Sequence, residues 1–210
     1  MTSSWDKYAH GAESWSTDAY ADGSAYLARR AALVRTLGPA LAPGDTVLDL
    51  ACGDGGLAEF LPEQRYAGVD ASPQMVEAAR RRGRNVVQAD LNDYEPSEPV
   101  QATTIFRAIY YARDRRTLLA RIAGYTETKL VFDLNPRQYR LEDVRADLRA
   151  AGFDRLALRP FFVPQTRAFP RPLALLLRAL ERSGPVARLL LRARFTYLCA
   201  AWGMGPGTKR

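Results

Sequence analysis

Residues 46–56 read TVLDLACGDGG, a short apolar run that leads through an acid into a glycine-rich turn. Val47, Leu48 and Leu50 have the composition of a buried strand, and residues 57–61 return to a helical pattern. Glycines permit positive φ and remove Cβ atoms, so the backbone amides of such a turn approach a ligand closely. The N-terminus of the following helix adds unpaired donors. This order of strand, turn and helix predicts a nucleoside-binding loop.

The spacing of the small residues separates two kinds of nucleotide site. Dinucleotide-binding dehydrogenases use Gly-x-Gly-x-x-Gly, whereas here Asp49 comes first and Ala51, Gly53 and Gly55 follow at two-residue steps. This pattern resembles motif I of the class I S-adenosylmethionine (SAM)-dependent methyltransferases, with alanine in place of the first glycine. The resemblance implies that the loop, Cys52 included, contacts SAM and that Asp49 accepts from its ammonium group. A purely structural turn is the alternative for the loop alone.

Two further acids end strand-like segments downstream. Residues 66–70 end at Asp70, before a Ser-Pro pair typical of a helix start, and residues 85–89 precede Asp90. By the same resemblance, Asp70 binds the ribose hydroxyls, Asp90 accepts from the adenine amino group, and Ala71 and Leu91 sandwich the ring. The alternative is that both acids cap helices or turns. Three strands that each end in an acid form a more specific pattern than the loop alone.

The acceptor side is expected beyond the fourth strand, because ligands of open parallel sheets bind at the carboxyl ends of the strands. Arg107 follows this strand and is assigned to the cofactor site. Tyr110 and Tyr111 are candidates to flank the methyl sulfonium or to hydrogen-bond an acceptor, since aromatic faces and phenol oxygens suit a cation. Ordinary packing of both tyrosines is the alternative.

The first 44 residues supply three more candidates. His10 is the only histidine and a candidate general base, with an exposed, non-catalytic side chain as the alternative. Tyr8 lies beside it, in a segment that the methyltransferase family folds over the cofactor. Either Arg29 or Arg30 can pair with the SAM carboxylate through its guanidinium fork, and Arg30 is taken as the candidate.

Strand and helix patterns alternate along the 210 residues, which are enough for one domain. Strand patterns cover residues 46–50, 66–70, 85–89, 101–106, 128–134, 153–163 and 195–202, and helical patterns cover 19–37, 56–62, 73–82, 114–123 and 139–151. The alternation predicts an α/β fold with a Rossmann-like, doubly wound, mostly parallel sheet. The resemblance implies seven strands, the last antiparallel. The expected parts are an N-terminal cap (1–44), a SAM-binding core (45–163), a helical insertion (164–194) and the last strand (195–202).

The insertion and its charge suggest a partner. Residues 1–136 hold 15 Lys and Arg against 18 Asp and Glu, a net −3, whereas residues 137–210 hold 15 against 5, a net +10. Within residues 171–194, leucines alternate with arginines over two helical pieces. Such a segment is either a lid, a contact with an anionic membrane, or a helical pair packed on the sheet with its arginines in water.

Bulk properties restrict location and chemistry. Two cysteines, Cys52 and Cys199, lack a pairing or metal-ligand spacing, and no metal cluster can be assembled. The N-terminus lacks the apolar core of a signal peptide, so a cytoplasmic protein is expected, peripheral to a membrane at most. The sequence favours neither monomer nor dimer.

The expected function is SAM-dependent methyl transfer to an O, N or C atom of a small, hydrophobic or lipid-linked acceptor, yielding S-adenosylhomocysteine. The alternatives are an RNA methyltransferase, which the charge permits although no RNA-binding module is recognisable, and a non-catalytic SAM-binding or peripheral membrane scaffold.

Overall fold

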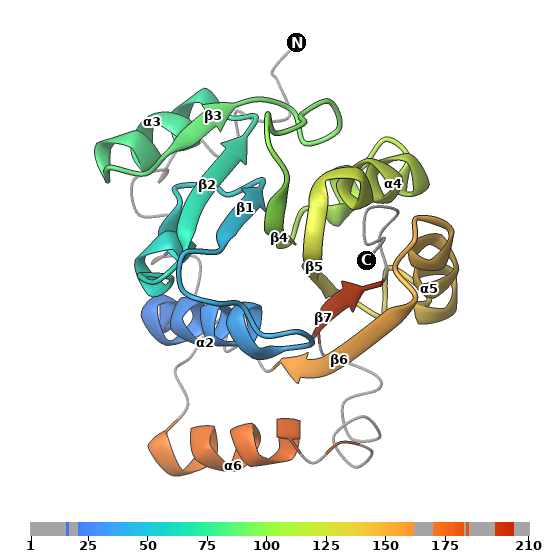
Figure 1. Cartoon of the computed structure of the whole chain (residues 1–210). Coiled ribbons are helices and arrows are strands. Elements are labelled where there is room, and N and C mark those ends of the chain that lie inside the picture. The colour runs from blue at the N-terminus through green and yellow to red at the C-terminus, as the bar shows by residue number, and fades with distance from the viewer. Residues whose placement is uncertain (1–15, 17–20, 162–169, 183, 185–195, 204–210) are drawn as a thin grey trace.

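The computed structural model describes residues 16, 21–161, 170–182, 184 and 196–203. Its centre is a seven-stranded sheet in the order β3-β2-β1-β4-β5-β7-β6 (Figure 1). The strands are β1 (Thr46–Leu50), β2 (Arg65–Asp70), β3 (Val86–Gln88), β4 (Val100–Ile105), β5 (Thr126–Leu134), β6 (Arg155–Phe161) and β7 (Thr196–Trp202). Strands β1 to β5 pair in parallel, and β7 runs antiparallel to both β5 and β6. The predicted fold class is therefore confirmed.

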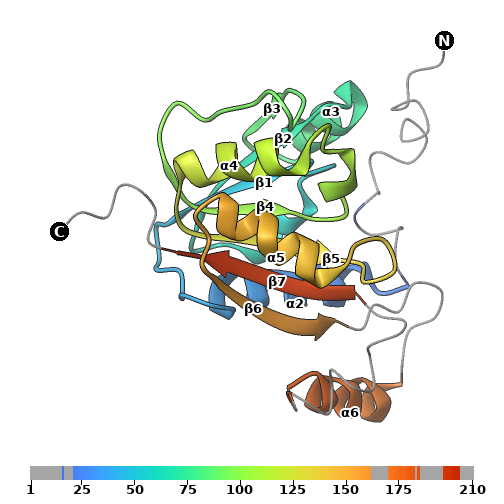
Figure 2. The ribbon, with the colours of Figure 1, turned by 90° about the vertical axis from the view of Figure 1, so that its right-hand side faces the viewer.

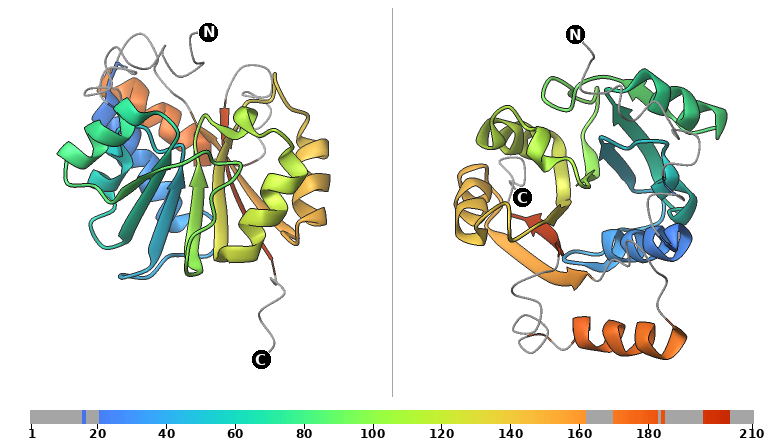
Figure 3. Two further views of the ribbon diagram at one scale, coloured as in Figure 1. Left: turned by 90° about the horizontal axis from the view of Figure 1, so that it is seen from above. Right: turned by 180° about the vertical axis from the view of Figure 1, so that it is seen from behind.

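Helices cover both faces of the sheet (Figures 2 and 3). They are α2 (Gly23–Thr36), α3 (Pro73–Arg81), α4 (Arg115–Tyr125), α5 (Leu141–Ala150) and α6 (Arg171–Arg182), with 3-10 turns η3 (Gly56–Phe60) and η4 (Ile109–Tyr111). Neighbouring β1 residues belong to different halves of the core: Leu48 and Leu50 pack with α4 and α5, and Val47 packs with α2. This burial on both sides explains why the strand is a nearly continuous apolar run.

Two predicted helical segments differ from the structure. The segment 56–62 is only the five-residue 3-10 turn η3. Pro62 follows it, and a proline disfavours the α conformation at the preceding residue, Leu61. Of the two helices expected within 164–194, the first is α6, and the second lies outside the described residues.

A buried lysine ties the sheet to the end of α2. Lys129 of β5 has no exposed surface, and its Nζ donates to the carbonyls of Leu37 at 2.9 Å, Pro39 at 2.5 Å and Arg35 at 3.3 Å. These carbonyls lie at and just beyond the C-terminus of α2, where backbone acceptors have no partner within the helix. Burial lowers the pKa of Lys129 to about 8, while the charge of Asp45 acts in the opposite direction.

Lys129→Met is expected to lower the free energy of unfolding at pH 7 by about 2 kcal/mol, because buried carbonyls lose a charged donor. The pKa of Lys129 is lower in the folded than in the unfolded protein, so the unfolded protein binds more protons at this residue between about pH 8 and 10.5. The wild type therefore gains stability relative to the variant as pH rises through this window. Chemical denaturation at several pH values measures both effects, with exposed Arg149→Met as the control. If the difference in free energy of unfolding between the wild type and Lys129→Met shrinks as pH rises, the lowered pKa of Lys129 is contradicted.

Candidate functional site

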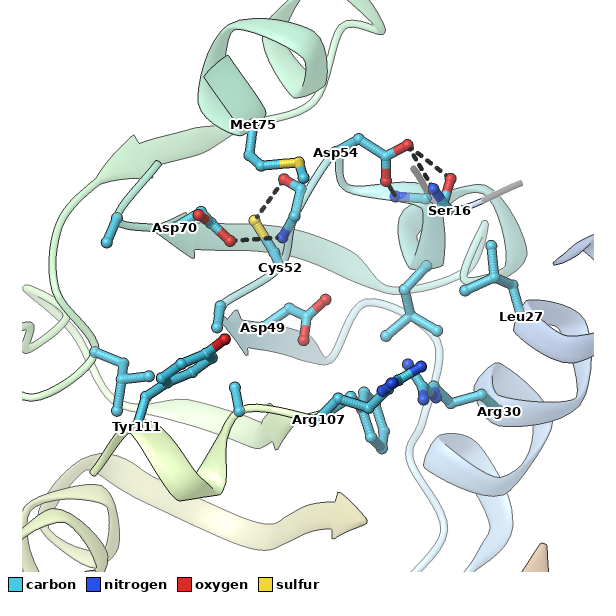
Figure 4. Close-up of a pocket in the computed structure, with 18 of the residues that line it drawn as sticks. Ser16, Leu27, Arg30, Asp49, Cys52, Asp54, Asp70, Met75, Arg107 and Tyr111 are labelled. Atoms are coloured by element: carbon cyan, nitrogen blue, oxygen red, sulfur yellow. Dashed lines mark hydrogen bonds between the residues drawn. The ribbon is translucent and has the colours of Figure 1, made fainter. Parts of the chain in front are cut away.

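A cavity of about 230 Å³ opens where β1, β2 and β4 end (Figure 4). These strands are parallel neighbours, so the loops that follow them meet at one edge of the sheet. The lining residues are Ser16, Tyr26, Leu27, Arg30, Asp49, Ala51, Cys52, Gly53, Asp54, Gly56, Leu57, Asp70, Ala71, Met75, Ala89, Asp90, Leu91, Phe106, Arg107, Ala108, Tyr110 and Tyr111. The cavity thus brings together residues from the N-terminal helix and from four successive strand ends.

The glycine-rich loop adopts left-handed backbone conformations along its length. Gly53 has φ +59° and Gly55 has φ +69°, which glycine adopts without strain. Ala51 also has a positive φ, +57°, although it carries a side chain. The structure therefore shows why a glycine is the more usual residue there, since the left-handed region costs other L-residues about 1 kcal/mol. At Gly56 a Cβ would lie 2.4 Å from the side chain of Ser16, so this close approach requires glycine.

Asp70 connects the loop after β1 to the start of α3. Its Oδ2 accepts from the backbone N of Gly53 at 2.8 Å, and its Oδ1 accepts from the backbone N of Ser72 at 2.9 Å. Burial raises the pKa of Asp70, and the backbone amides act against that rise. Each carboxylate oxygen keeps a further lone pair for a ligand in the cavity.

Asp49 is a buried acid at the end of β1. It is 4% exposed, its Oδ1 accepts from Thr104 Oγ1 at 2.6 Å, and its Oδ2 accepts from Tyr66 Oη at 2.9 Å. Burial raises the pKa of Asp49 to about 6, although both hydroxyl groups and the charge of Arg30 lower it. Burial also raises the pKa of the adjacent Cys52 thiol, so this cysteine lines the cavity in its neutral form.

Asp90 lines the cavity two residues after the end of β3. Its Oδ1 accepts from the backbone N and Nδ2 of Asn92, at 2.8 and 2.7 Å, and its Oδ2 accepts from Arg113 at 2.9 Å. Burial acts to raise the pKa of Asp90, but these donors outweigh it and the pKa is lowered. Asp90 is therefore an ionised acceptor, and the buried Leu91 follows it on the cavity wall.

The structure distinguishes the two candidate arginines of α2. Arg30 lines the cavity, is 8% exposed, and places its guanidinium 4.3 Å from the Tyr26 ring and 4.1 Å from the Phe106 ring. Arg29 instead lies over Phe161, at 4.7 Å, and is not among the lining residues. Arg30 is thus the guanidinium that a ligand in the cavity can reach.

Arg107 and the two tyrosines form the wall after β4. Arg107 has a positive φ of +53° and its backbone N donates to Asp133 Oδ1 at 2.6 Å. Tyr110 is 44% exposed, whereas Tyr111 is half-buried and points into the cavity (Figure 4); their ring centroids are 4.4 Å apart. The predicted Tyr8 and His10 lie outside the described residues.

The family of this fold follows from its sequence. Residues 47–128 match the family model of a methyltransferase domain, and this segment contains β1 to β4 and most of the cavity wall. By this match, residues 47–128 are similar to the methyltransferase-domain family.

Curated relatives match part of this methyltransferase domain. A stretch of 79 residues is 37% identical to the trans-aconitate 2-methyltransferase of Rhodococcus jostii and covers 36% of this chain and 31% of that protein. A stretch of 101 residues is 34% identical to the trans-aconitate 2-methyltransferase of an Azoarcus species and covers 45% of this chain and 40% of that protein. The matched stretches therefore span less than half the length of these relatives.

Solved structures share the fold over more of the chain. A methyltransferase from Haloferax volcanii, solved in complex with the Trm112 methyltransferase activator, has a TM-score of 0.67 at 21% identity and covers 97% of this chain and 99% of that one. The SAM complex of phosphoethanolamine N-methyltransferase 2 from Haemonchus contortus has a TM-score of 0.66 at 19% identity, with 97% and 61% covered. Identities this low establish a common fold and nothing finer.

Several residues of the cavity were not predicted from the sequence, and Asp54 is the most prominent of them. This acid is 1% exposed, accepts from the backbone N and Oγ of Ser16 at 3.1 and 2.8 Å, and lies 3.2 Å from Arg82. Its place inside the glycine-rich loop is the signal that was available. Gly55, predicted at the cofactor, is absent from the lining residues, because its Cα faces Arg84 and Ala79.

The described residues contain no group of three or more His, Cys, Asp and Glu side chains placed to hold a metal ion. The acids of the site instead bond to hydroxyl groups and backbone amides, as Asp49 and Asp70 do.

Asp49→Asn is expected to stabilise the ligand-free protein, by about 2 kcal/mol more at pH 7.5 than at pH 4. The pKa of Asp49 is higher in the folded state, about 6, than its ordinary 3.8, so its contribution to stability is present below pH 3.8 and lost as pH rises through 6. Denaturation at the two pH values measures the difference. Asp93→Asn, at a carboxyl outside the cavity, is the control. Equal effects of Asp49→Asn at both pH values would contradict the raised pKa.

Proposed function

We propose that this protein transfers the methyl group of SAM to an oxygen, nitrogen or carbon atom of a small molecule. The observation that carries the proposal is that the glycine-rich loop, Asp49, Asp70 and Asp90 all line one cavity at the carboxyl edge of the sheet. Any one of these acids could be explained as a cap of a helix or turn. That explanation gives no reason for all three acids to line the same cavity together with Arg30.

The residues present fit each part of SAM. Asp70 has lone pairs for the ribose hydroxyls, and Asp90 with Leu91 offers an acceptor beside an apolar surface for adenine. Asp49 provides a buried negative charge for the ammonium, and Arg30 a guanidinium for the carboxylate. The cavity therefore offers each group of the cofactor a partner of the right charge.

When bound, SAM supplies a methyl group that is already electrophilic, so the protein has to position its two substrates and exclude water. Tyr111 and Arg107 lie on the cavity wall after β4, where they can hold an acceptor against the reacting carbon. Tyr110 covers the more open side. His10 remains the candidate general base for an acceptor that must lose a proton.

The acceptor wall suits a molecule with an apolar body and one anionic or polar group. Phe106, Ala108, Tyr110 and Tyr111 provide apolar and aromatic surface, and Arg107 provides the single cation among them. The names of the curated relatives refer to trans-aconitate, a small carboxylic acid, which agrees with an arginine on this wall. A hydrophobic or lipid-linked acid meets the same description, so we propose an acceptor of this broader class.

Calorimetric titration with S-adenosylhomocysteine tests the cofactor site. Asp70→Ala is expected to weaken binding by about 100-fold or more, because two hydrogen bonds to a charged acceptor are lost. Asp93→Ala, which removes a nearby carboxyl outside the cavity, should leave the affinity unchanged. Absence of binding by the wild type would refute the proposal.

Methyl-labelled SAM then separates the three functions. Label that enters a small-molecule extract in the presence of the wild type, and not of Asp70→Ala, supports the proposed reaction. Label that enters RNA instead favours the RNA methyltransferase. Tight binding of the cofactor without transfer to either pool leaves a scaffold as the better description.

Arg30 and its neighbour Arg29 provide a matched pair of variants that tests the contact with the carboxylate of the cofactor. Arg30→Met is expected to weaken binding of S-adenosylhomocysteine by about tenfold or more, since a buried charged hydrogen bond is lost. Arg29→Met removes the same charge one residue away, at a side chain that lies over Phe161, and should change affinity less than about twofold. Equal losses in the two variants would show that net charge, and not a specific contact, explains the effect.

A further inference from the structure

The helix α6 exposes leucine side chains outside the main body of the fold. Leu173, Leu175 and Leu176 are 39, 64 and 56% exposed, and they are three of the five large hydrophobic residues exposed in the described part of the chain. Figures 1 and 2 both draw α6 outside the sheet and the helices that cover it, and its main described neighbour is β6. Exposed leucines at this density on one short helix indicate a binding surface.

The sequence on either side of these leucines is strongly basic. Residues 162–195 contain one acid, Glu181, against seven arginines, at positions 167, 171, 178, 182, 188, 192 and 194. Within α6, positions 171, 178 and 182 are seven and four residues apart, so the helical period places them along one side of the helix. Positions 171, 178 and 182 therefore share one side of the same helix that carries the exposed leucines.

From this combination we propose that α6 docks the protein onto an anionic phospholipid bilayer. Leucines enter the boundary of the acyl chains while arginines meet the phosphates, which is how interfacial helices bind. An RNA partner would use the arginines but gives no reason for the leucines. A second copy of this chain would bring two equally basic segments together, which like charges oppose.

The helix lies on the bilayer and does not cross it. Its 12 residues span about 18 Å, against about 30 Å for the hydrocarbon core. No helix within the described ranges is long and apolar enough to span a membrane. The surface is therefore peripheral, and its attachment should be reversible and sensitive to salt.

The position of α6 relates this surface to the methyltransferase cavity. The antiparallel strand β7 pairs with both β5 and β6, so β6 runs in the same direction as the strands whose ends form the cavity. The chain leaves β6 at that edge of the sheet before it enters α6, and Figure 3 draws α6 toward the same edge. The docking helix α6 therefore follows the strand β6 at the same edge of the sheet at which the cavity opens.

Sedimentation of the full chain with vesicles tests the proposal, without SAM and so independently of the proposed reaction. We expect binding to phosphatidylcholine vesicles that contain phosphatidylglycerol, little binding to phosphatidylcholine alone, and a decrease as salt is raised. The double variant Leu175→Ser/Leu176→Ser should lower the partition coefficient about tenfold or more. Arg171→Ser/Arg178→Ser should lower it about 25-fold, or about fivefold for each charge.

Val87→Ser is the matched control for the leucines, because Val87 is 44% exposed on β3, at the opposite edge of the sheet. It should leave vesicle binding unchanged, and melting temperatures should show that all variants are folded. Failure to bind phosphatidylglycerol vesicles, or binding that survives the leucine variant, would overturn the proposal. So would a wild-type dimer that Leu175→Ser/Leu176→Ser converts to a monomer, or RNA retention that depends on the arginines and not on the leucines.

Discussion

The carboxylate of Asp70 holds together the two loops on which the cavity depends. It accepts from Gly53, in the loop after β1, and from Ser72, at the start of α3, with one oxygen for each. The parallel pairing of β1 and β2 brings these loops side by side, but strand pairing ends at Leu50 and Val69 and does not fix the backbone beyond. The carboxylate therefore fixes the glycine-rich loop in the conformation that exposes its backbone to the cavity.

The site retains several features that work against stability. Burial raises the pKa of Asp49 and of Asp70, which means that each charge is held in a less favourable medium than water. Ala51 and Arg107 adopt left-handed conformations, each at a cost of about 1 kcal/mol or more. Ala51 follows β1 directly, and Arg107 lies two residues beyond the end of β4. The strained backbone and the buried carboxylates thus lie on the cavity wall, which is where a ligand can contact them.

The strand ends were predictable from the sequence because each is a short, largely apolar run with an acid at or near its end, and this pattern is local. Asp49, Asp70 and Asp90 were identified in this way, and the cavity brings them together. Contacts between distant segments leave no such local pattern: Asp54 bonds to Ser16, 38 residues away. Neighbours on an α-helix point in directions about 100° apart, and packing decides which of them faces the cavity. The direction of each residue in a turn likewise depends on its own backbone conformation. Hence the sequence left Arg29 and Arg30 open, and it did not predict that Gly56 lines the cavity where Gly55 does not.

Strand β5 positions both arginines of the site without lining the cavity itself. Lys129 holds the end of the helix that carries Arg30, and Asp133, farther along the same strand, accepts from the backbone N of Arg107. The charges of Arg30 and Arg107 act on Asp133, and the charge of Arg30 also acts on Asp49. The charge of Arg30 therefore acts on two buried carboxylates, of which Asp49 lines the cavity. An ammonium beside Asp49 and a carboxylate beside Arg30 each meet an opposite charge, whereas a purely anionic ligand brings a like charge to Asp49. This pairing of opposite charges favours the zwitterionic tail of SAM over a purely anionic ligand at this end of the cavity.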